Sequence, residues 1–117
     1  MKNVILALAI LFSFTLTAQE IKPVMESQDN GLTKATFFHD NGQIAQTGFY
    51  KEGKPHGEWI GYDANGKKVA IGEYDTGKKI GKWFFWSGGQ LNEVDYRDSR
   101  IVGVTKWSNS NSIAVNK

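Results

Sequence analysis

The sequence contains no cysteine. Disulfide bonds, a zinc site with cysteine ligands and a thiol nucleophile are therefore excluded, as is lipid attachment through an N-terminal cysteine. Histidine is scarce as well. Only His39 and His56 are present, and neither is surrounded by residues with the spacing of metal ligands. We therefore expect no metal site and no cofactor, and we interpret both histidines as solvated turn residues.

An excess of charge of one sign is also lacking. The chain has 14 lysine and arginine residues against 12 aspartate and glutamate residues, a net charge of +2. This balance gives no long-range field to gather nucleic acid, and we expect no nucleic-acid partner. Lysines near the expected turns are offset by nearby acidic residues, so we interpret them as solubilising residues that protect sheet edges, with contact to an anionic surface as the alternative. These lysines are Lys51, Lys54, Lys67, Lys68, Lys78, Lys79 and Lys82, and the acidic residues are Glu52, Glu58, Asp63, Glu73 and Asp75.

The longest apolar run lies at the N-terminus. Lys2 precedes a mainly apolar segment of 13 residues, 4–16, and the small residues Thr17 and Ala18 follow it. This order is typical of a signal peptide and predicts cleavage after Ala18, which makes the protein exported and either periplasmic or secreted. Cleavage removes Lys2 and leaves 13 basic against 12 acidic residues, a net charge of +1. An uncleaved anchor is the alternative, although the uncharged segment 3–19 is shorter than the roughly 20 apolar residues that a membrane helix needs.

A repeat of 24 residues dominates the rest of the chain. Residues 48–59 align with residues 72–83, and six of the twelve aligned positions are identical. The segments before them match as well, because an aromatic residue and Asn-Gly occur in both 38–42 and 62–66. Repeats at a fixed spacing indicate an array of similar structural units. The identical pairs are Gly48/Gly72, Tyr50/Tyr74, Gly53/Gly77, Lys54/Lys78, Gly57/Gly81 and Trp59/Trp83.

The repeat continues in weaker form on both sides, as arrays require at their ends. A third copy has a shorter glycine turn at 86–89, keeps the tyrosine-to-glycine spacing with Tyr96 and Gly103, and places Trp107 24 residues after Trp83. In the polar tail, Ile113 and Val115 could add a weak edge strand. We therefore divide the chain into a signal peptide (1–18), a lead-in with a degenerate half-repeat (19–35), a repeat domain of about three units (36–107) and the tail (108–117).

Each unit is expected to form two strands joined to their sequence neighbours. Asn41-Gly42 and Asn65-Gly66 predict tight hairpin turns. The other turns, 51–55 and 75–79, are expected to be longer, with Gly53 and Gly77 in the left-handed conformation. The predicted fold is all-β, a single-layer antiparallel meander that grows by two strands, or roughly 10 Å, per unit. The expected strands are 44–50, 57–62, 69–74 and 81–86.

The pattern Gly-x-Tyr-x-x-Gly-Lys-x-x-Gly-x-Trp, followed by an aromatic residue and Asn-Gly, resembles the MORN repeat. It is most similar to the bacterial YwqK-type variant, an antitoxin-like repeat family. The resemblance covers residues 36–107 and implies a sheet of stacked hairpins used as a binding or spacing platform. MORN repeats in general are linked to membrane-lipid association and protein scaffolding. The structural repeat positions are Tyr50, Gly53, Gly57, Trp59, Tyr74, Gly77, Gly81, Trp83 and Trp107.

The aromatic residues are the main candidates for function. Trp59, Trp83 and Trp107 are expected to form one column on one face, together with Phe85, each ring covering a glycine of its neighbour. The strand glycines at 48, 57, 72 and 81 would then leave space for these rings. An exposed strip that grips a partner is the alternative to a core. On the other face, with Ile60 and Phe84, Tyr62 and Trp86 are the better candidates for partner binding.

Catalysis is not expected. The carboxylates Asp40, Glu52, Asp63, Glu73 and Asp75 are spread over the turns, and a single layer offers no deep pocket in which two of them would act together. The sequence therefore favours an exported, non-enzymatic module that docks a protein through its sheet face or edge. Two alternatives stay open: antitoxin-like neutralisation of a toxin or effector outside the cytoplasm, and binding of a glycan or membrane surface through the aromatic face.

Overall fold

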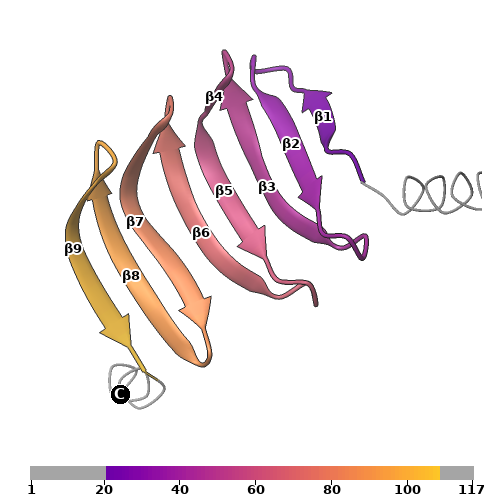
Figure 1. Ribbon diagram of the computed structural model, residues 1–117. Helices are drawn as coiled ribbons and strands as arrows, with labels where there is room; N and C mark the ends of the chain where they lie inside the picture. Colours follow the sequence, from indigo (N-terminus) through magenta and orange to yellow (C-terminus); the bar gives the residue numbers. More distant parts are fainter. Residues whose placement is uncertain (1–20, 109–117) are drawn as a thin grey trace, which may run out of the picture.

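In the computed structural model, which describes residues 21–108, the chain forms one antiparallel sheet and no helix. The strands follow each other across the sheet in sequence order, from β1 at one edge to β9 at the other, and the short β4 pairs only with β3 (Figure 1). The predicted single-layer meander is confirmed. The strands are β1 (Val24–Ser27), β2 (Thr33–Phe38), β3 (Ile44–Lys51), β4 (Lys54–Pro55), β5 (Gly57–Tyr62), β6 (Lys68–Asp75), β7 (Lys78–Ser87), β8 (Gln90–Arg97) and β9 (Arg100–Trp107).

All four predicted strands occur, at β3, β5, β6 and β7. The strand predicted at 81–86 is longer than expected, because Lys78–Ile80 of β7 also pairs with β6 beyond a register shift. The predicted signal peptide (1–18) and all but the first residue of the predicted tail (108–117) lie outside the described residues, so both stay predictions.

The two kinds of turn are the reverse of the prediction. Lys51 pairs with Lys54, so Glu52-Gly53 is a two-residue turn, and its φ angles of 51° and 81° are typical of type I′. Thr76-Gly77 repeats it with 44° and 90°. The left-handed conformation predicted for Gly53 and Gly77 is confirmed, but the expectation of longer loops there was wrong.

The Asn-Gly turns are the longer ones. His39 N–H donates to the Gln43 carbonyl at 2.8 Å, so the loop closes over five residues, and of the Asn-Gly pair only Gly42 has positive φ. Asn41 acts through its side chain instead, since its Oδ1 accepts the Gln43 N–H at 2.9 Å. The turn at Asn65-Gly66 has the same backbone hydrogen bonds.

The core lies on one side of the sheet, which we call the tryptophan face. Trp59 and Trp83 are only 5% and 6% exposed. Each indole covers a strand glycine, Gly48 and Gly72 respectively, where an added Cβ would overlap the ring. The predicted role of these two glycines is confirmed. Gly57 and Gly81 serve differently, because space surrounds both and each has positive φ, 82° and 70°.

Tyrosines join the two tryptophans into one aromatic row. Tyr74 stands edge-on between Trp59 and Trp83, with ring centroids 6.0 and 5.0 Å away. Tyr50 extends the row beyond Trp59 at 5.2 Å, and Tyr96 extends it beyond Trp83 at 5.8 Å. Each indole N–H also donates to a main-chain carbonyl, of Phe49 at 3.0 Å and of Glu73 at 3.2 Å. A sheet without a second layer thus builds its core from rings laid over its own backbone.

The predicted tryptophan column ends at Trp83. Trp83 pairs with Val94, whereas Trp107 pairs with Leu91, three residues away along β8. Because side chains alternate along a strand, Trp107 lies on the other face, which we call the opposite face. The expectation that it shares the column was wrong. The cause is an extra residue in β9: Tyr96 pairs with Ile101 and Asp95 pairs with Gly103, so Val102 has no partner on β8 and the residues from Gly103 onward change face.

Both histidines connect neighbouring turns, so their interpretation as solvated residues was wrong. His39 Nε2 lies 2.8 Å from the Tyr62 carbonyl, one unit further along. His56 Nδ1 accepts the Thr76 N–H at 3.0 Å, and the Gly77 N–H donates to the Pro55 carbonyl at 2.7 Å. The turns at both ends of the strands are thereby hydrogen-bonded from one unit to the next.

Candidate functional site on the opposite face

A continuous cross-strand row runs along the opposite face. Register pairs link Thr36 to Thr47, Thr47 to Ile60, Ile60 to Ile71, Ile71 to Phe84 and Phe84 to Glu93. Ile60, Ile71 and Phe84 form its apolar centre and are partly exposed. No second layer covers this row among residues 21–108, so it is a surface available to a partner.

Trp86 is the most exposed tryptophan of the sheet, at 37%. It lies near the end of β7, and its ring stacks beside that of Phe84 with centroids 6.3 Å apart. Trp59 and Trp83 each donate the indole N–H to a carbonyl, whereas no such bond is made by Trp86 within the described residues. Its indole therefore keeps both a free N–H and a free ring surface.

Tyr62 lies on the opposite face as well, by alternation with Ile60, but it is half-buried and lies on β5. Strand β6 separates it from β7, and no ring contact joins Tyr62 to Trp86 in residues 21–108. The two residues chosen from the sequence therefore share a face without forming one cluster.

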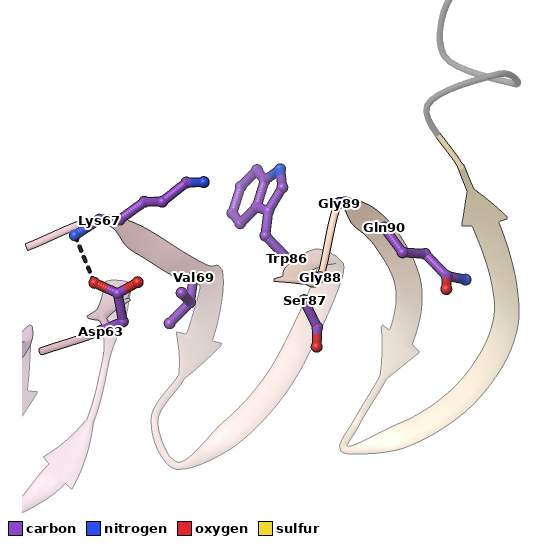
Figure 2. Close-up of a pocket in the computed structure, with 8 residues that line it drawn as sticks. All are labelled: Asp63, Lys67, Val69, Trp86, Ser87, Gly88, Gly89 and Gln90. Carbon is purple, nitrogen blue, oxygen red and sulfur yellow. Dashed lines mark hydrogen bonds between the residues drawn. The ribbon is translucent and has the colours of Figure 1, made fainter. Parts of the chain in front are cut away.

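A shallow hollow lies beside Trp86 (Figure 2). It is bounded by two neighbouring turns, the Asn65-Gly66 turn and the Gly88-Gly89 turn. Asp63 is held in place by two main-chain donors, because its Oδ1 accepts the N–H of Asn65 and of Lys67, both at 2.9 Å. The side chains of Lys67 and Trp86 rise on the same side of the turns. The lining residues are Asp63, Lys67, Val69, Trp86, Ser87, Gly88, Gly89 and Gln90.

The hollow exists because a connection between turns is missing there. At the preceding junction, His39 bonds to the Tyr62 carbonyl and Asn41 Nδ2 donates to the Ala64 carbonyl at 2.8 Å. One unit later, Asp63 occupies the position of His39, and the next turn is shorter. Within the described chain no hydrogen bond joins these two turns, and the space between them stays open beside Trp86.

Sequence reasoning missed a second polar cluster on this face. Lys82 Nζ lies 2.8 Å from Glu93 Oε2, and the Trp107 N–H donates to Glu93 Oε1 at 3.3 Å. The hydrogen bond from Lys82 lowers the pKa of the Glu93 carboxyl, and the same bond raises the pKa of Lys82. Glu93 belongs to no recurring position of the repeat. The sequence indicated only that Leu91, Glu93 and Asp95, two residues apart, would lie on the same face of a strand.

The same face carries like charges in register. Glu58 pairs directly with Glu73, and both line a second shallow hollow together with Lys82 and Phe84.

Nothing in residues 21–108 groups three or more histidine, aspartate or glutamate side chains so that they could hold a metal ion. The described part of the chain also contains no helix that is long and apolar enough to cross a membrane. The opposite face can therefore make aromatic contacts and hydrogen bonds with a partner across a shallow surface.

Comparison with known protein families gives one match. Residues 33–52 and 55–76 each match the family model of the MORN repeat variant. The first stretch covers β2 and β3, and the second covers β5 and β6, so each match is one hairpin. No curated protein and no solved structure matches the chain. The match is to the repeat variant as a whole and does not distinguish the YwqK-type branch, and within residues 33–76 the chain contains two MORN repeats of this variant.

Proposed function

We propose that the protein is an exported, non-catalytic module that binds another protein through its opposite face, with Trp86 as the main contact. MORN repeats commonly serve as modules for protein or membrane interaction, and the family is generally non-catalytic. Export rests on the predicted signal peptide at residues 1–18.

The observation that carries the proposal is the contrast between Trp86 and the two core tryptophans. Trp59 and Trp83 are buried and hydrogen-bonded, so their role in holding the sheet is accounted for. Trp86 contributes an exposed ring beside a hollow, next to the partly exposed Phe84. Exposed tryptophans that can be fully desolvated by a partner are frequent centres of binding energy in protein interfaces.

A membrane surface is a weaker candidate because two of the lysines are already engaged. Lys79 lies over the rings of Trp83 and Tyr96, about 5 Å from each centroid, and Lys82 pairs with Glu93. The charge that remains is offset by nearby acidic residues, so attraction to anionic lipid is expected to be small. Glycan binding and antitoxin-like neutralisation gain no separate support from this geometry.

The test compares variants of the full chain as baits in envelope extract. Trp86→Ser should abolish capture of a specific partner, and Tyr62→Ser should weaken it. Met25→Ser is the matched control, because Met25 is an exposed apolar residue of β1, far from Trp86 in the sheet. A partner captured equally by Trp86→Ser and by Met25→Ser would refute the role of Trp86.

Flotation with vesicles containing anionic lipid tests the membrane alternative. The expected result is little binding at low ionic strength and no change on neutralising Lys67, Lys68, Lys78 and Lys79. Strong flotation that falls with salt and survives Trp86→Ser would replace the protein partner with a lipid surface.

A further inference from the structure

The two edge strands of the sheet, β1 and β9, differ in length and in how many apolar side chains they expose. β1 has four residues, follows Pro23 and carries Glu26. β9 has eight residues and pairs only with β8 within residues 21–108, so among these residues nothing covers its other side. Its apolar side chains are exposed, Ile101 at 59%, Val102 at 51% and Val104 at 54%. A short strand with a charge and a nearby proline offers little edge to a partner, whereas β9 offers a longer apolar edge on which Arg100 and Lys106 and the extra residue Val102 restrict which strands can pair.

The open side of β9 presents main-chain donors and acceptors in a regular row. From Gly103 to Trp107, β9 pairs with Asp95 to Leu91 without a register shift. The outer N–H and C=O groups of such a strand alternate at the spacing of an extended chain, and another strand satisfies them in series. We propose that β9 accepts an added strand from a different protein, and that this strand is acidic and rich in β-branched residues.

The charge of β9 selects the chemistry of that strand. β9 carries Arg100 and Lys106 and no acidic residue, and neither forms an ion pair within residues 21–108. On the facing strand β8, the Glu93 carboxylate is already bound by Lys82 and by the indole N–H of Trp107. Acidic residues near both ends of an added strand would therefore meet unpaired cations, and opposite charges across strands stabilise the pairing. Between them, β-branched residues would cover Ile101, Val102 and Val104.

A second copy of this chain fits β9 less well. Two β9 strands paired antiparallel about Gly103 would place Arg100 of one copy opposite Lys106 of the other, and like charges directly opposite each other destabilise a sheet. The β1 edge of a second copy offers one acidic residue and half the length of β9. The tail, residues 109–117, contains no acidic residue to meet Arg100 and Lys106. We therefore assign the added strand to another protein.

This surface is separate from Trp86, so its test is independent of the proposed function. The probe is a labelled ten-residue peptide, Ser-Glu-Val-Thr-Val-Thr-Val-Thr-Glu-Ser, whose binding to the full chain is followed by fluorescence anisotropy. Binding should be saturable and should be lost when the central residues of the peptide are N-methylated, because this removes the main-chain donors. A peptide with lysine in place of both glutamates should bind roughly tenfold more weakly.

The double variant Arg100→Glu with Lys106→Glu should reverse this preference and bind the lysine peptide better than the glutamate peptide. Binding of the lysine peptide shows that the variant is folded, and its loss on N-methylation shows that the main chain of the edge, and not charge alone, is recognised. Trp86→Ser should leave peptide binding unchanged. Equal binding of the N-methylated peptide, no reversal in the double variant, or a concentration-dependent dimer that the peptide does not dissociate would each overturn the proposal.

Discussion

The indole of Trp83 lies directly on the main chain of Gly72, in the place that any side chain at that position would occupy. Gly72→Ala should therefore destabilise the protein by about 1–3 kcal/mol, because the methyl group has to displace a buried ring. Gly103→Ala is the matched control, since its Cβ would meet only the Asp95 side chain at 3.7 Å and its φ is not positive. Urea unfolding measures both variants. Equal losses would mean that the packing of Trp83 on Gly72 is not what excludes a side chain.

Trp83 and Trp107 should differ in their contribution to stability. Trp83 is 6% exposed and touches the rings of Tyr74, Phe85 and Tyr96, so Trp83→Ala is expected to cost about 3–5 kcal/mol. Trp107 lies on the opposite face, on the edge strand, and is partly exposed, so Trp107→Ala should cost clearly less. Denaturant melts of the two variants compare them directly. Similar losses would contradict the placement of Trp107 outside the core.

Much of the fold could be predicted because the same pattern of residues occurs in two consecutive units. Gly48 with Trp59 and Gly72 with Trp83 recur at the same spacing, and their packing could be derived from alternation along the strands. The third unit could not be placed in this way. Trp107 keeps the spacing of 24 in sequence, but the extra residue Val102 in β9 moves the rest of that strand to the other face, and counting residues does not reveal where a strand contains a bulge.

The candidate site was predictable only in part. Alternation placed Tyr62 and Trp86 on the same face, but the hollow beside Trp86 depends on a hydrogen bond that is missing between two turns. The two kinds of turn are the reverse of the prediction, because a type I′ turn needs positive φ at both central residues, whereas Asn41 keeps a negative φ and bonds through its side chain. The position of β9 at the edge of the sheet follows from the order of the strands, which the sequence of one strand does not reveal.

The ion pair between Lys82 and Glu93 predicts a pH dependence of stability. The pKa of Glu93 lies below its ordinary value of 4.5, chiefly because of the hydrogen bond from Lys82. The folded state therefore binds this proton less readily than the unfolded state. The stabilisation is present above pH 4.5 and is lost as the pH falls through the lowered pKa.

Thermal melts between pH 6 and pH 3 should show this loss in the natural protein and a smaller one in Glu93→Gln. In Lys82→Gln, the titration of the Glu93 carboxyl followed by NMR should move upward toward 4.5. The Lys82 side chain is exposed, so the effect on stability is expected to be small. An unchanged Glu93 titration in Lys82→Gln would show that the pair does not persist in solution.

Asn41 and Asn65 occupy equivalent positions in consecutive turns, yet only one of them connects two units. Asn41 Nδ2 donates to the Ala64 carbonyl, and its Oδ1 accepts the Gln43 N–H. The side chain of Asn65 makes no hydrogen bond within residues 21–108; only its main-chain N–H is bound, by Asp63. Asn41→Ala should therefore cost about 0.5–1.5 kcal/mol per hydrogen bond lost, whereas Asn65→Ala should cost almost nothing.

Hydrogen exchange separates this local effect from a general loss of stability. In the natural protein, amides of the 39–43 and 63–67 turns should exchange more slowly than those at 88–90, because only the first two turns are joined to each other. In Asn41→Ala this difference in exchange rate should shrink, since only the hydrogen bond of His39 would then join the first two turns. If Asn65→Ala loosened the turns as much as Asn41→Ala, the bond to Ala64 would not be what closes the first junction, and the hollow beside Trp86 would need another cause.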